Sequence, residues 1–155
     1  MDPLILLSPI PETICIPYLD IPNDINVYFM VYAKKNIEGR CRKEGFIYPN
    51  TLRVESCSTG ILMADRVKYD VIFSGNVCNP EMNMNVECKI INITKIGIRA
   101  VISDVNNPMV LFISREHNPS KNFEEYTINQ IISVKILGTR FELYDSYISA
   151  IAEIN

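Results

Sequence analysis

Apolar and polar residues alternate most strictly in the segment 66–78. Val67, Tyr69, Val71 and Phe73 occupy alternate positions in it. A period of two residues is typical of a β-strand with one packed face. We therefore predict one long strand over this segment.

Shorter strands precede it, at Ile37–Tyr48 with an interruption at Gly45, and at Leu52–Cys57. The turn residues Pro49-Asn50 and Ser58-Thr59-Gly60 suit short connections between antiparallel strands. The first 22 residues hold five of the nine prolines. Because proline has no N–H to donate to a central ladder, only short or edge pairing is expected there, with one strand over Thr13–Pro17.

The segment 23–36 shows a helical period. Its apolar face consists of residues at three- and four-residue spacing, namely Ile25, Tyr28, Phe29 and Tyr32. Asn23 or Asp24 can cap the helix. The alternative is a strand, because Val27, Phe29 and Val31 also alternate. We predict the helix.

The sequence Cys78-Asn79-Pro80-Glu81 interrupts these patterns, since proline ends strand pairing. We predict a domain boundary there, with a small α+β unit over residues 1–79 and a β unit over 80–155. Five strands are expected in the second unit, at Val86–Thr94, Gly97–Asp104, Met109–Ser114, Ile131–Gly138 and Tyr147–Ile154. Five strands in this length suggest an OB-type barrel, with a helix or loop inserted at Arg115–Gln130. The fold class is therefore α+β and mostly β.

Composition narrows the class of protein. The chain has 155 residues, of which 48% are hydrophobic and 21% charged, as in globular proteins. No apolar run reaches the roughly 18–20 residues that cross a bilayer, and the N-terminus lacks a basic signal region, so we expect an intracellular protein without a membrane contact. The five cysteines form no CxxC pair and are interpreted as reduced core thiols, with no metal and no cofactor.

The net charge of −3 argues against a general nucleic-acid binder, because such proteins gain affinity by neutralising phosphates. Any RNA binding must come from a local patch. Catalysis is not expected either: the chain has one histidine, His117, and no GxSxG, HExxH or phosphate-loop motif. A small hydrolase would need a pocket around His117. The simpler reading is an exposed or RNA-facing loop histidine.

The candidate patch is the turn Thr94-Lys95-Ile96-Gly97-Ile98-Arg99, in which two basic residues flank a glycine that permits a tight reversal. OB folds bind ligands on their second and third strands and the adjoining loops. Lys95, Arg99 and Arg115 are therefore candidate phosphate contacts. The set is extended by Lys89, Lys135 and Arg140. The alternative is that these are solvated charges at strand edges, and Phe112 is either a base-stacking residue or core.

Taken in order, these segments resemble the stalk subunit of multisubunit DNA-dependent RNA polymerases, which is the seventh subunit of the eukaryotic enzyme and has a counterpart in archaea. The resemblance covers nearly the whole chain. Its specific points are Ile37–Ile47, Val67–Phe73, Lys95–Ile98 and Phe112–His117. The short N-terminal lead and compact barrel look most like versions encoded by large cytoplasmic DNA viruses, which would place the protein in the host cytoplasm and the virion.

The resemblance implies a non-catalytic subunit. Its N-terminal tip domain would dock on the large polymerase subunits, and its barrel would face nascent RNA. A second stalk subunit is a possible further partner. Carried over to this sequence, the docking loop consists of Arg42, Lys43, Glu44, Gly45, Phe46 and Ile47.

The sequence departs from RNA-binding relatives of the barrel just after the turn glycine, where Ile98 and Arg99 stand in place of an aromatic residue. RNA contact is therefore expected to be weak, salt-sensitive and non-specific. The alternative function is a free-standing OB-fold RNA-binding protein of translation or RNA decay.

Overall fold

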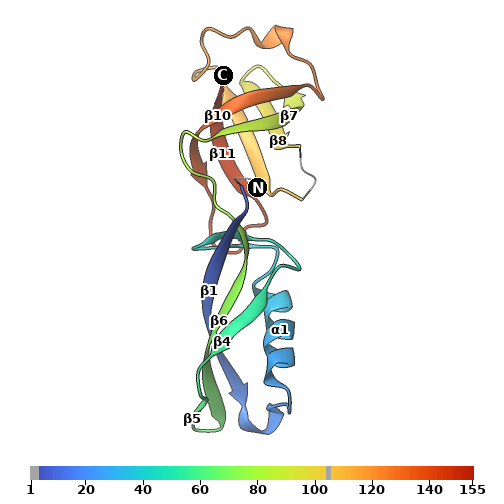
Figure 1. Ribbon diagram of the computed structural model, residues 1–155. Helices are drawn as coiled ribbons and strands as arrows, with labels where there is room; N and C mark the ends of the chain where they lie inside the picture. The colour runs from blue at the N-terminus through green and yellow to red at the C-terminus, as the bar shows by residue number, and fades with distance from the viewer. Residues whose placement is uncertain (1–3, 104–105) are drawn as a thin grey trace.

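The computed structural model describes residues 4–103 and 106–155. The protein is elongated, with an N-terminal α+β unit at one end and a closed five-stranded barrel at the other (Figure 1). Most of the chain is β-strand, and α1 is the one α-helix of the described residues. The predicted fold class, mostly β with a C-terminal barrel, is confirmed.

The N-terminal sheet is organised around β6 (Arg66–Cys78), the long strand that the alternation predicted. One edge of β6 pairs with a single strand along almost its whole length, and the other edge pairs with three short strands in succession. The remaining strands of this sheet are β1 (Leu6–Pro17), β2 (Cys41–Arg42), β3 (Gly45–Ile47), β4 (Arg53–Cys57) and β5 (Ile61–Met63).

Strand β1 is twelve residues long, so the prediction of a short strand over Thr13–Pro17 was wrong about its length. β1 pairs only with β6 and is an edge strand, as expected for a proline-rich segment. The positions of Pro9, Pro11 and Pro17 differ by even numbers, and the β1–β6 register has no shift between them. Alternate residues of an antiparallel pair donate to the partner strand, so all three prolines can occupy positions whose N–H would face solvent.

The segment 37–48 forms the small hairpin β2–β3, and its turn is Lys43-Glu44 instead of the predicted interruption at Gly45. Gly45 lies within β3, at a φ of +126°, where an added Cβ would come within 2.5 Å of the Cys78 carbonyl oxygen. Glycine is therefore required by close backbone approach. The sequence analysis missed β5, whose three exposed apolar residues do not alternate.

The predicted helix is confirmed as α1 (Ile25–Asn36), after a short 3₁₀ turn η1 (Tyr18–Asp20). Asp24 is the N-cap, and its carboxylate accepts a hydrogen bond from the Asn26 N–H. Phe29 and Ala33 are buried against the sheet, and the Phe29 ring meets Tyr69 edge-on at 5.6 Å. The strand alternative for this segment was wrong, because tertiary packing favours the helical face.

The barrel contains five strands close to the predicted ones: β7 (Asn85–Ile93), β8 (Gly97–Ile102), β9 (Met109–Ser114), β10 (Ile131–Arg140) and β11 (Ile148–Ile154). They close in the order β10-β11-β9-β8-β7, with β11 and β9 parallel and the other pairs antiparallel. This is a five-stranded Greek-key barrel of the OB type. The insertion between β9 and β10 holds one 3₁₀ turn, η2 (Phe123–Glu125), whose Phe123 is buried.

The two units have separate cores, but the barrel core extends across the predicted boundary at residue 79. Leu4, Cys41, Phe46, Tyr48 and Cys78 belong to the same buried cluster as the inner residues of the barrel. The other cluster joins α1 to the inner faces of β1 and β6. The end of the barrel that faces the N-terminal unit is therefore filled by residues of that unit.

The cysteines are all free, as predicted. Cys41, Cys78 and Cys88 are buried, and burial raises the pKa of the Cys88 thiol to about 12. Burial, and then the nearby Asp145 carboxylate, raise the pKa of Cys41 to about 11. Cys15 and Cys57 are exposed, so the reading of all five as core thiols was wrong for these two.

Candidate nucleic-acid interface

The outer face of β8 and β9 places Arg99 and Phe112 side by side. The two residues are cross-strand partners, and Asn92 of β7 is the partner of Arg99 on its other side. The Phe112 side chain is 39% exposed, so its core reading was wrong. Ile98 is fully buried, which explains why an aromatic residue could not stack from that position. The aromatic surface comes instead from the next strand.

The hairpin turn between β7 and β8 carries Lys95 at its tip. The Thr94 N–H donates to the Gly97 carbonyl at 2.8 Å, and the Thr94 hydroxyl accepts from the Ile96 N–H at 3.3 Å. An added Cβ at Gly97 would lie 2.2 Å from the Ile113 carbonyl oxygen. Glycine is therefore required at position 97 because the backbone of β9 lies so close. The hydrogen bonds of Thr94 stabilise the tight turn, which the sequence analysis had explained by the glycine alone.

A shallow groove of about 440 Å³ lies on this face of the barrel. Its lining includes the Arg99–Phe112 pair, and β7, β9 and β11 supply polar and aromatic neighbours. The full lining is Asn92, Thr94, Gly97, Arg99, Val110, Leu111, Phe112, Tyr147, Ser149 and Ala150. Neither Arg99 nor Lys95 forms an ion pair within residues 4–103 and 106–155, so both cations are available to a phosphate.

Arg115 follows β9 beside this turn, because its N–H donates to the Ile96 carbonyl at 3.2 Å. Its guanidinium lies 5.0 Å from the centre of the Phe123 ring, a cation–π contact that occupies one face of the side chain. Arg115 therefore borders the groove without pointing freely into it.

His117 is an exposed loop residue, as the simpler reading predicted. Its buried neighbour Asn118 organises the loop. The Asn118 amide donates to the Ser114 carbonyl at 2.8 Å, and its oxygen accepts from the Ile154 N–H at 2.7 Å. The sequence analysis missed this role, since an asparagine in a polar loop gives no periodic signal.

The residues proposed to extend the basic patch are dispersed. Lys135 forms an ion pair with Glu153 at 2.8 Å, and Arg140 lies 3.7 Å from Glu142. Lys89 is exposed on β7 opposite Val101, away from the groove lining. Of the predicted set, Lys95, Arg99 and Phe112 come together, Arg115 borders them, and the other four residues lie elsewhere.

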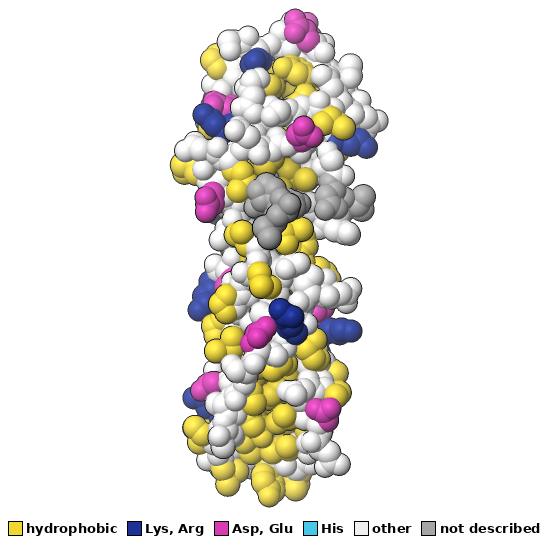
Figure 2. Space-filling view, in the orientation of Figure 1, with side chains coloured by type: hydrophobic (Ala, Val, Ile, Leu, Met, Phe, Trp, Pro, Cys, Tyr) yellow, Lys and Arg dark blue, Asp and Glu magenta, His cyan; other side chains and the backbone are white. Residues whose placement is uncertain are grey.

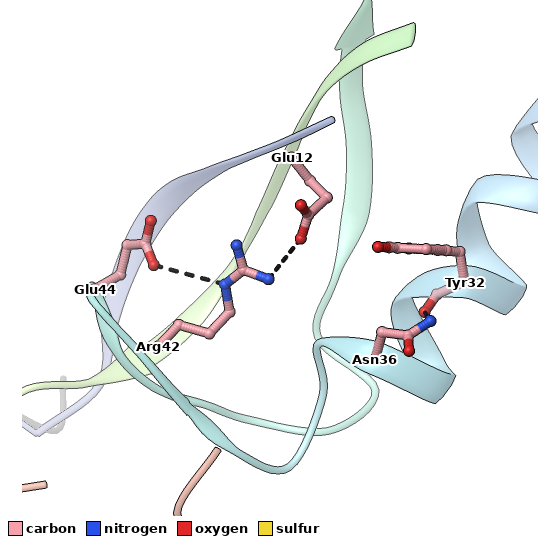
Figure 3. Close-up of polar contacts among 5 residues, drawn as sticks. All are labelled: Glu12, Tyr32, Asn36, Arg42 and Glu44. Atoms are coloured by element: carbon pink, nitrogen blue, oxygen red, sulfur yellow. Dashed lines mark hydrogen bonds and ion pairs between the residues drawn. The ribbon is translucent and has the colours of Figure 1, made fainter. Parts of the chain in front are cut away.

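The predicted docking loop lies at the junction of the two units, and Figure 3 shows its residues Arg42 and Glu44 with their neighbours. Arg42 lies between two carboxylates: its Nη1 is 2.6 Å from Glu12 Oε2, and its Nε is 3.9 Å from Glu44 Oε2. Both Glu44 carboxylate oxygens are buried, and neither has a hydrogen-bond partner among residues 4–103 and 106–155. Tyr32 lies beside this group, and burial, followed by the Glu12 charge, raises its pKa.

Burial limits what the docking loop can offer to a partner. Phe46 is 7% exposed and meets the Tyr48 ring edge-on at 5.8 Å, and Ile47 is fully buried. Gly45 is also buried, whereas Lys43 is exposed. The loop therefore joins the N-terminal unit to the barrel. A Phe46→Asp substitution would disrupt the core that the two units share and not a docking surface.

Exposed apolar side chains gather at the end of the molecule farthest from the barrel. Figure 2 shows this hydrophobic surface at the lower end of the N-terminal unit. Leu19 is 93% exposed, and Tyr18 and Leu62 are more than 60% exposed. We call these three residues with Ile61 and Met63 the distal apolar surface. A shallow pocket of about 480 Å³ lies between Leu19 and Leu62, which η1 and the β5–β6 hairpin supply.

In the described part of the chain no cluster of histidine, cysteine and acidic residues could hold a metal ion. No helix there is long and apolar enough to span a membrane.

Comparison with known proteins adds little. No family model and no curated protein match the chain. Among solved structures it is similar to an uncharacterized protein of Methanocaldococcus jannaschii, at 15% sequence identity and a TM-score of 0.38. The match covers 46% of this chain and 90% of the archaeal protein. A likeness this weak carries no functional argument.

Proposed function

We propose that this protein is a non-catalytic stalk subunit of a DNA-dependent RNA polymerase. The observation that carries the proposal is the separation of two different surfaces on one elongated molecule. The distal apolar surface suits burial against protein, and the groove of the barrel, with free cations beside an exposed aromatic ring, suits single-stranded nucleic acid.

Docking is assigned to the distal apolar surface in place of the loop Arg42–Ile47. Leu19 is 93% exposed, and exposure of its apolar side chain to water is unfavourable. Burial of this side chain against a partner would therefore stabilise the complex. Contiguous exposed apolar side chains on a small protein are typical of interaction sites. The large polymerase subunits are the proposed partner, and the junction around Arg42 transmits the position of the docked tip to the barrel.

RNA contact is assigned to the barrel face and is expected to be weak. Arg99 lines the groove and Lys95 follows the lining residue Thr94, and among residues 4–103 and 106–155 neither cation has a carboxylate or ring engaging it. Each neutralised phosphate contributes to a salt-dependent affinity, so two free cations give a shallow salt dependence. A guide for emerging transcript needs this kind of contact, because tight binding would retain the RNA.

In this proposal the protein acts without an active site of its own. Its proposed compartment is that of the polymerase, which is the host cytoplasm and the virion if the gene is viral. A second stalk subunit is a further proposed partner. A free-standing RNA-binding protein is the second candidate, because the groove does not by itself require a polymerase.

The test is affinity purification of the full tagged chain from cells that express it, with mass spectrometry of the bound chains. Recovery of the two large polymerase subunits, resistant to ribonuclease, supports the stalk function. Recovery of RNA without those subunits would favour the free-standing protein. A Leu19→Asp variant tests the docking assignment. Leu19 is 93% exposed, so the variant should fold normally but should no longer recover the large subunits.

A further inference from the structure

Tyr147 lines the groove of the barrel from the opposite end to Phe112. It precedes β11, where Ser149 and Ile151 are exposed and Ile148 and Ala150 are buried. Tyr147 shares the outward phase of that strand, and its side chain is 48% exposed. Neither the Tyr147 ring nor the Phe112 ring contacts another aromatic ring within the described residues.

The strand register gives the spacing of the two rings. β9 and β11 are parallel, and Phe112 is the partner of Ile151, four residues beyond Tyr147. At roughly 3.3 Å per residue the rings are about 13 Å apart along the strand direction. Stacked bases follow one another at about 3.4 Å, so no single base can contact both rings. Two bases of one strand, separated by others, can do so.

The groove between the rings carries groups suited to a nucleotide backbone. Val110 and Ser149 are cross-strand partners on its floor, and Asn92 and Arg99 are partners on its side. Arg99 supplies the positive charge, and the serine hydroxyl and asparagine amide supply hydrogen-bonding groups. The arrangement is two aromatic rings on neighbouring strands, with a cation beside Phe112 on the side away from β11.

The N-terminal unit holds the loop that carries Tyr147. The Cys41 N–H donates to the Asp145 carbonyl at 2.8 Å, and the Tyr144 N–H donates back to the Cys41 carbonyl at 2.8 Å. The Cys41 thiol lies 3.7 Å from the Tyr147 carbonyl oxygen. The backbone that carries Tyr147 is therefore held by β2, and the groove is complete only in the full chain.

We propose that Phe112 and Tyr147 stack two bases of the same single-stranded RNA, with Arg99 on a phosphate beside the base on Phe112. The two bases are then about four steps apart, so the bound segment is about five nucleotides, near the lower end of the range for OB folds. This inference rests on the proposed RNA role of the barrel and adds the second stacking residue and the length of the ligand.

The experiment is fluorescence anisotropy of the full chain with 5′-fluorescein-labelled oligouridines of two, four, six and twelve nucleotides at low salt. Affinity should rise steeply from four to six nucleotides and slowly after that. Tyr147→Ala should weaken binding of the hexanucleotide by about 5- to 150-fold and abolish the rise, because stacking is lost at one ring. Tyr147→Phe should bind as the wild type does.

Tyr18→Ala is the matched control, since Tyr18 is 62% exposed at the other end of the molecule. It should leave the affinity unchanged. Wild-type affinity in a folded Tyr147→Ala variant would overturn this inference and leave the RNA role standing. No binding of the wild type even to the dodecamer would overturn both.

Discussion

The two ends of this protein differ in what they leave exposed. The distal end presents leucine, isoleucine and methionine side chains on η1 and β5, whereas the barrel groove presents an arginine, aromatic rings and small polar groups. Each unit has buried a full core, so the exposed groups are surplus to folding. Under the proposed function, this difference corresponds to two classes of partner, a protein at the distal end and a nucleic acid at the barrel.

The two units differ at their exposed ends but share buried residues at their junction. The Phe46→Ala substitution tests whether these shared residues make the two units unfold together. We expect a loss of about 3–5 kcal/mol in the free energy of unfolding, because the ring packs with the inner residues of the barrel. Urea unfolding followed by circular dichroism should show one transition for the whole chain. Phe112→Ala, an exposed control, should change the free energy by less than about 0.5 kcal/mol. Two separate transitions, with only the first shifted, would show that the units fold independently.

The distal end is tested by the double variant Leu19→Asp, Leu62→Asp. Both leucines are exposed, so the variant should fold normally and bind RNA as the wild type does. Assembly with the polymerase should weaken by about 2–4 kcal/mol, the range of interface hot spots. Ile128→Asp, at an exposed position of the barrel unit, is the control. Assembly that is normal in the double variant and impaired in the control would reverse the assignment of the two ends.

The cations of the barrel separate into free and paired ones. Lys95→Gln with Arg99→Gln should make the slope of log affinity for single-stranded RNA against log salt shallower by about 1.4, the effect of two lost phosphate contacts. The matched pair, Lys135→Gln with Arg140→Gln, removes the same charge from residues that already lie beside Glu153 and Glu142. We expect little change in its slope. Equal slopes for both pairs would mean that net charge, and not the groove, governs binding.

The smallest effect concerns the buried thiol of the barrel. The pKa of Cys88 is raised from 9.0 to about 12, so above pH 9 the unfolded chain loses a proton that the native protein retains. Stability should therefore be unaffected by this group below pH 9 and fall as pH rises from 9 towards 12. Between pH 8.5 and 10 the loss should be about 1 kcal/mol greater in the wild type than in Cys88→Ala. Cys57→Ser, an exposed control, should retain the wild-type pH dependence; a Cys88→Ala profile that also matches it would contradict the burial argument.

The sequence predicted the strands of the barrel well because Val86, Cys88 and Ile90 alternate with exposed residues as a half-buried strand requires. It failed for β5 and for the length of β1, where pairing along β6, and not side-chain periodicity, makes the strand. For the site it identified Lys95, Arg99 and Phe112 but not Tyr147. Register between distant strands decides which residues meet, and a single sequence carries no direct signal for register.

The docking residues show the same limit in another form. The family resemblance pointed to Arg42–Ile47 as the docking loop, yet Phe46 and Ile47 are buried. Leu19 and Leu62 gave no signal, since apolar residues are expected inside and only the fold shows that these remain outside. Exposure of an apolar side chain is a property of the structure alone.

The most direct test places a photo-crosslinking phenylalanine analogue at each end in turn, at Leu19 and at Phe112, in transcription complexes that contain radiolabelled nascent RNA. We predict that the analogue at position 19 crosslinks to a large polymerase subunit and not to RNA, and that the analogue at position 112 crosslinks to RNA. RNA crosslinks at both positions, or no crosslink to a polymerase subunit at position 19, would contradict the assignment of one end to protein and the other to transcript.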